Sequence, residues 1–189
     1  MNYKNTWIKQ LGIAIRFVVR NFNLAKPRMR YLHSPQKMII KTLSILFERD
    51  LLRLREEISG YQVDANIWKV SEAISNSGGN LCLHLVGNLN TYIGKELGKT
   101  NYVRNRELEF SLKDVPRTEL IAMIDDTTDV VISTLNALRP EDMQLDFPVV
   151  VLEHVNTTEY MLIHLESHLN YHLGQINYHR RLLDANNGK

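Results

Sequence analysis

Hydrophobic residues recur at spacings of three and four along four segments of the chain, the pattern of helices that bury one face. These segments cover residues 39–59, 77–94, 117–138 and 157–184, and Thr157 or Thr158 would cap the last of them. No repeated strand pattern accompanies them. We therefore predict an all-α fold in which four helices form a bundle.

The connections between these helices differ in character. Residues 61–75 form a connection that carries Trp68, and residues 95–116 are polar and are interpreted as a long loop. Residues 147–151 look extended, which predicts a short strand pair between the third and fourth helices.

Charge separates the first 37 residues from the rest. They contain eight Lys and Arg and no Asp or Glu, which leaves 15 basic and 21 acidic residues in the remainder. We expect residues 1–37 to be a basic extension, with translation starting at Met38 or with the extension poorly ordered. The domain would then occupy residues 38–185, and residues 186–189 would be a tail.

Residues 1–37 could also be a signal peptide, a transmembrane helix or an amphipathic surface helix. Arg16 interrupts the apolar run of a signal peptide and no small-residue cleavage site follows it, while the run is too short for a transmembrane helix of about 20 residues. An amphipathic helix with an apolar face from Ile8 to Phe22 fits better, and it would bring residues 1–37 into contact with a membrane surface.

Composition narrows the functional classes. An acidic domain argues against nucleic-acid binding through a basic face. The single cysteine, Cys82, excludes an intrachain disulfide, and nothing indicates an oxidising compartment, so we expect a cytoplasmic protein. Leucines surround Cys82, which predicts a buried, unreactive thiol.

Histidines supply the strongest chemical signal. His168 and His172 are four residues apart, so their imidazoles lie about 40° apart on one helix face and can converge on one ion. His84, at the edge of the apolar stripe of the second helix, would be the third ligand from a facing helix. Three neutral imidazoles suit Zn, Ni, Fe or Mn and leave coordination positions open. The alternative is that each histidine is a hydrogen-bonded structural residue.

Two further histidines lie on the same predicted helix. His164 falls toward the rim of the site, and His179 is two turns from His172, too far to share an ion with it.

The motif His168-Leu-Asn-Tyr-His172-Leu-Gly174-Gln175-Ile176 resembles the last-helix motif of the DinB/YfiT-like superfamily of metalloenzymes. The segment 83–89 around His84 is similar to its second-helix histidine segment, and residues 104–110 resemble a loop typical of a branch known only as a domain of unknown function. The similarity covers residues 38–185. It implies an up-down-down-up four-helix bundle with His84, His168 and His172 as metal ligands. Many relatives carry Arg where this chain has Leu173, so a role for that Arg does not carry over.

The resemblance also implies an activity, the metal-dependent transfer of a small thiol to an electrophilic small molecule. Gln175 would orient a ligand or the substrate, and His164 and Asn88 are further candidates around the metal. Arg104 and Arg106 would recognise substrate carboxylates, unless they are solvated loop charges paired with Glu107 and Glu109.

Two other functions compete with thiol transfer. Metal-dependent hydrolysis needs a general base, and Glu166 lies about 120° from His172 and is predicted to face solvent. A non-catalytic, stress-related dimeric module would use the metal only to hold two helices together. A homodimer is expected in either case, because bundles of this type pack through an outer helix face.

Overall fold

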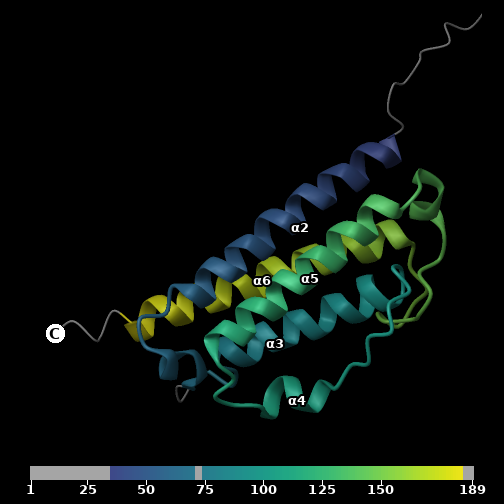
Figure 1. Ribbon diagram of the computed structural model, residues 1–189. Helices are drawn as coiled ribbons and strands as arrows, with labels where there is room; N and C mark the ends of the chain where they lie inside the picture. The colour runs from purple at the N-terminus through teal and green to yellow at the C-terminus, as the bar shows by residue number, and fades with distance from the viewer. Residues whose placement is uncertain (1–34, 71–73, 185–189) are drawn as a thin grey trace, which may run out of the picture. The chain divides into compact units, whose positions relative to one another are not determined.

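The computed structural model describes residues 35–70 and 74–184, and in these ranges every secondary-structure element is a helix (Figure 1). The prediction of an all-α fold is therefore confirmed. Within the described ranges four helices are long, and four short helical segments lie between them. The long helices are α2 (Pro35–Ser59), α3 (Gly78–Leu89), α5 (Arg117–Ala137) and α6 (Thr158–Asp184). The short segments are η1 (Asp64–Trp68), η2 (Asn90–Lys95), α4 (Arg106–Ser111) and η3 (Pro140–Gln144).

The long helices run in two directions. Helices α2 and α6 are parallel, since Asp50 bonds Asn170 and, seven residues further along both helices, Glu57 bonds Asn177. Figure 1 shows α3 and α5 running the opposite way, beside α6 and α2 respectively. This arrangement places one face of α3 against one face of α6.

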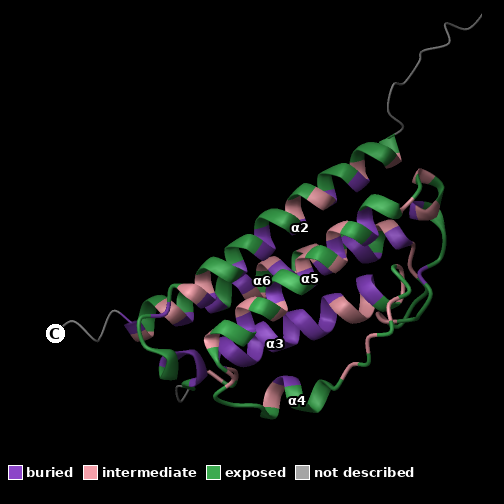
Figure 2. Ribbon diagram, viewed as in Figure 1, coloured by how far each residue is buried: buried purple, intermediate pink, exposed green. Residues whose placement is uncertain are grey.

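Helix α3 lies at the centre of the domain. Every residue from Gly78 to Leu89 is buried, whereas α2, α5 and α6 each bury one face and expose the other (Figure 2). Ser77 caps α3, its hydroxyl oxygen accepting a hydrogen bond from the Asn80 amide nitrogen at 3.1 Å. A polar side chain on α3 must therefore find its partners inside the protein.

Helix boundaries agree with the sequence pattern at most ends and differ at three places. Helix α2 begins at Pro35, four residues before the predicted start, because proline is well tolerated in a first helical turn. After Leu89 the second helix continues as the π-helix η2, in which Glu96 N bonds Thr91 O at 3.1 Å. The third difference is α4, which lies within residues 95–116 that were interpreted as loop.

The predicted strand pair between α5 and α6 is wrong. Within the described residues this region holds only isolated bridges, between Asp146 and Thr157 and between Leu152 and His154. Val149 and Val150 are exposed and have no sheet to pack against. An extended apolar pattern does not form a strand pair without a neighbouring surface that buries one of its faces.

A buried carboxylate joins α2 to α6. Asp50 is fully buried and accepts hydrogen bonds from Arg49, at 2.8 and 2.7 Å, and from Asn170. Burial opposes ionisation, but the hydrogen bonds from Arg49, Glu166 and Asn170 hold the pKa of Asp50 below its usual value. Burial and the neighbouring Asp50 raise the pKa of Glu166. The two carboxyl groups thus form a structural pair at this interface.

Residues 1–34 and 185–189 include several of the predicted features. The amphipathic helix, the basic extension up to Ser34 and the tail fall outside the described residues. Among the helices that the structure does describe, none combines the length and the apolar character needed to cross a membrane.

Cys82 is fully buried in α3, as the sequence predicts, and burial raises the pKa of its thiol to about 12. A thiol with this pKa carries almost no thiolate at pH 8, and thiolate is the reactive form. We expect the folded protein to leave Ellman's reagent unreduced over an hour at pH 8 and to react stoichiometrically after denaturation. Rapid reaction of the folded chain would contradict this assignment.

Candidate metal centre

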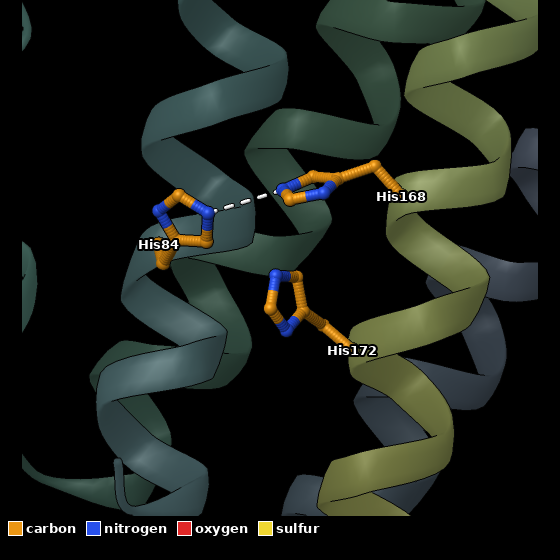
Figure 3. A group of neighbouring side chains, drawn as sticks. All are labelled: His84, His168 and His172. Carbon is orange, nitrogen blue, oxygen red and sulfur yellow. Dashed lines mark hydrogen bonds between the residues drawn. The ribbon is translucent and has the colours of Figure 1, made fainter. Parts of the chain in front are cut away.

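Three histidines from two helices meet inside the domain. His84 comes from α3, and His168 and His172 come from successive turns of α6 (Figure 3). One nitrogen from each ring lies within 4.8 Å of the other two. His84 is buried and the other two are half-buried. The structure thus brings together the three side chains that the sequence singles out, in an arrangement that could hold a metal ion.

A carboxylate fixes the orientation of His84. Nδ1 of His84 lies 3.0 Å from Oε2 of Glu109, and Glu109 is buried. Burial disfavours the charged carboxylate, but hydrogen bonds from Arg104 and His84 hold the pKa of Glu109 below its usual value. An ionised carboxylate only accepts hydrogen bonds, so Nδ1 of His84 donates to Glu109 and Nε2 is the nitrogen that faces the other histidines.

Arg104 anchors Glu109 in turn. Nε of Arg104 donates to Oε1 of Glu109 at 2.6 Å, and its Nη2 donates to Oε2 at 2.8 Å. Gly87, three residues after His84 on α3, leaves room for the Glu109 carboxylate, because a β-carbon at position 87 would collide with it. The short helix α4, capped by Asn105, therefore places Glu109 beside Nδ1 of His84, and Arg104, which precedes the cap, completes the ion pair.

An amide fixes the orientation of His172. Nε2 of Gln175 donates to the Tyr171 hydroxyl at 3.3 Å, which identifies Oε1 as its acceptor end. Oε1 lies 2.7 Å from Nδ1 of His172, so that nitrogen donates and Nε2 is left as the available lone pair. Gln175 therefore holds the His172 ring through this hydrogen bond.

His168 faces His84 directly, with their Nε2 atoms 3.1 Å apart (Figure 3). Burial, with the nearby His172 and His84, lowers the pKa of His168 to about 4, so the ring is neutral at pH 7. Without an ion, one Nε2 must carry a hydrogen and donate to the other. Metal–nitrogen bonds of about 2.0–2.1 Å in a tetrahedral site place two ligand nitrogens roughly 3.3 Å apart, close to the observed separation.

The remaining candidates lie around this group. The His164 ring stacks on that of His168 with centroids 6.2 Å apart, and it does not join the triad. Asn88, one helical turn beyond His84, is buried and its Oδ1 has no hydrogen-bond partner. Arg106 lies over the Phe110 ring at 5.9 Å. Arg104 forms an ion pair with Glu109, as expected if the loop charges pair with each other. The pair is largely buried, however, and not a solvated pair of the loop surface.

His179 is a structural residue. Its Nε2 donates to the carbonyl oxygen of Lys69 at 2.9 Å, so Nδ1 accepts a hydrogen bond from the Tyr61 hydroxyl at 2.6 Å. This arrangement agrees with its exclusion from the triad.

The prediction that Glu166 faces solvent is wrong. Glu166 is half-buried, and its Oε1 accepts a hydrogen bond from Asn170 at 2.7 Å in the cluster around Asp50. The helix α2 covers this side of α6, which explains why a charged residue there is not free in solvent. Its carboxyl group interacts with Asn170 and Asp50 at the interface between α2 and α6.

Glu109 is the functional residue that sequence reasoning missed, although it lies in the segment quoted for the family resemblance. Its partner His84 is 25 residues away, and nothing in the residue spacing connects them. The available signal was chemical, since a buried histidine on α3 requires a polar partner for its second nitrogen.

Comparison with known proteins bears on the family but not on the reaction. A search of curated proteins finds no match to this chain. A family model described as "Protein of unknown function (DUF1572)" matches residues 37–189, which include the triad and both residues that orient it. The chain therefore belongs to the DUF1572 family.

Proposed function

We propose that this protein is a metal-dependent enzyme in which His84, His168 and His172 bind a divalent transition metal and the metal activates a small thiol toward an electrophile. The observation that carries the proposal is the convergence of three imidazoles. In two of them, His84 and His172, Nδ1 is hydrogen-bonded to Glu109 and Gln175 respectively, so Nε2 faces the centre of the group. Histidine ligands of metals commonly carry such a partner, which fixes the tautomer and the direction of the lone pair.

The donor set fits Zn, Ni, Fe or Mn better than Ca or Mg, because imidazole nitrogen suits the former group and oxygen the latter. Three protein ligands leave at least one coordination position for an exogenous molecule. A bound ion would supply a Lewis-acidic centre that lowers the pKa of a thiol placed at that position.

The fold supports the same assignment. The helix directions, with α2 and α6 one way and α3 and α5 the other, are those of the up-down-down-up order. They support a four-helix bundle of the DinB/YfiT-like type, to which the motifs around His84 and His168 are similar. Thiol transfer is the activity that this resemblance implies.

The thiol must come from outside the chain. Cys82 is the only cysteine of the sequence, and it is buried with a pKa of about 12. In the proposed reaction the S–H bond of a free thiol breaks and its proton passes to solvent. The sulfur then forms a bond to the electrophilic carbon, and the leaving group departs with the electron pair of the bond that it breaks.

Hydrolysis is less well supported because it needs a free general base beside the metal. Glu166 bonds Asn170 on the side that α2 covers, and Glu109 is held by Arg104 and His84. Neither carboxylate is free to take a proton from water.

Activity can be tested with the full chain reconstituted separately with Zn, Ni, Fe and Mn. Each form is incubated with cysteine, glutathione or 2-mercaptoethanol and an electrophile such as 1-chloro-2,4-dinitrobenzene, and thioether formation is followed by mass spectrometry. We expect one metal form to exceed the rate of the same free metal, and His84→Ala to return the rate to that background. Full metal occupancy with no electrophile consumed by any thiol would overturn the proposal.

A further inference from the structure

A cavity of about 560 Å³ opens beside the triad. Its walls come from the C-terminal half of α6, the start of α3 and the segment that precedes α3. The residues that matter here are Leu81, Tyr171, Gly174, Gln175 and Tyr178. Its size is that of a pocket for a small organic molecule.

The cavity is connected to the triad through two of its wall residues. Gln175 accepts the hydrogen bond from His172, and the ring of Tyr171 lies edge-on to that of His172 with centroids 5.1 Å apart. Leu81 precedes His84 by three residues on α3, and Gln175 follows His172 by three on α6, so these two wall residues lie about one helical turn along each helix from a candidate ligand. A molecule that fills the cavity can therefore extend a polar end to the metal.

The wall carries no formal charge. Its nine residues include no Asp, Glu, Lys or Arg, and both nitrogens of the one histidine, His179, are already engaged by Tyr61 and Lys69. Two exposed tyrosine rings, those of Tyr171 and Tyr178, stand on the same face of α6 and offer a flat apolar surface to a ligand. Such walls desolvate a flat apolar group at little cost and penalise an ionised one, which would lose its water without gaining a counter-charge.

Gly174 keeps this space open. It lies in the interior of α6, where glycine is less favourable than alanine. A β-carbon built on it meets no atom within 4 Å, so no neighbouring helix requires its absence. Packing against a neighbouring helix therefore does not explain this glycine, and a larger side chain at position 174 would extend into the cavity.

We propose that this cavity binds the flat, uncharged, apolar body of a substrate whose polar end occupies the open coordination position of the metal. The inference rests on the proposed function, because the metal anchors one end of the ligand. It adds the substrate class, an uncharged aromatic or similarly flat molecule, and identifies Gly174 as the residue that determines it.

Hydroxamates test the inference without any turnover, because the same metal-binding group can carry different bodies. Binding of acetohydroxamic, benzohydroxamic and 4-carboxybenzohydroxamic acid to the zinc-loaded full chain is measured by calorimetry. We expect the phenyl compound to bind on the order of tenfold more tightly than the methyl compound, from burial of the ring. The carboxylated ring should lose most of that gain.

Two leucine variants on the same face of α6, one inside the cavity and one outside it, test whether the cavity itself causes the preference for the phenyl compound. Gly174→Leu should fill the cavity and reduce benzohydroxamate to the affinity of acetohydroxamate. Ser167→Leu, exposed two turns earlier on the helix, should keep the preference for the phenyl compound. Zinc content and melting temperature are measured first for both.

Each result has a distinct meaning. Equal affinity of the three hydroxamates for the wild-type chain would overturn the cavity assignment while leaving the metal site intact. A phenyl preference that survives Gly174→Leu would overturn it as well. If no hydroxamate binds and no zinc is retained, the proposed function fails, and this inference fails with it.

Discussion

Replacing His168 and His172 together with alanine is expected to lower the metal content of the purified protein from about one ion per chain to a trace. The variant removes two of three ligand nitrogens, and a single buried imidazole on α3 cannot retain a transition metal against dilution. Elemental analysis of protein purified without chelators measures this directly. Competition with a coloured chelator then gives the affinity of the wild-type site.

His179→Ala is the matched control, because this histidine lies on the same helix and is more deeply buried than His168 and His172. It should lower the melting temperature, since the Tyr61 hydroxyl and the Lys69 carbonyl lose their partner, yet retain the ion. Equal metal content in the wild type and the His168→Ala/His172→Ala variant would show that the three rings form a structural cluster only.

The spacing of hydrophobic residues is sufficient to predict the long helices. The spacing of the histidines on α6 is sufficient to predict that His168 and His172 lie together. The spacing of four between His168 and His172 fixes their geometry as soon as α6 is helical, and α6 ends at Asp184, where the pattern predicts. His84 could be proposed because it borders an apolar stripe that must face another helix. These inferences need only the shape of one helix at a time.

The parts that sequence could not supply depend on contacts between distant segments. Helix α4 has six residues, fewer than two turns, so it shows no periodic pattern, and its charged residues resemble a solvated loop. Only the packing of α4 on α3 shows that Glu109 is buried against His84. The same limit explains Glu166, whose environment depends on where α2 lies. It also explains the residues after Asp146, which had no neighbouring surface to make them a strand pair.

Glu109→Gln is expected to reduce metal affinity by about 10- to 100-fold, the usual effect of losing the partner that orients a histidine ligand. The amide nearly preserves the shape of the side chain but is neutral, and it cannot accept from His84 and from both nitrogens of Arg104 as the carboxylate does. A half-buried Arg104 also loses its counter-charge, so unfolding should become easier by about 1–3 kcal/mol. Chelator competition and urea denaturation of the metal-free protein measure the two effects separately.

The variant Asp50→Asn is the control that distinguishes a change in the orientation of His84 from a general loss of folding stability. Asp50 is also a buried carboxylate held by an arginine, Arg49, but it contacts α6 through Asn170, on the side of that helix away from the triad. Its replacement should cost comparable stability and leave metal affinity unchanged. If both variants lost metal to the same extent, affinity would simply follow stability, and Glu109 would have no specific role at the site. If Glu109→Gln alone loses metal, the carboxylate determines the orientation of His84, and the segment that carries Glu109 is part of the metal site of this protein.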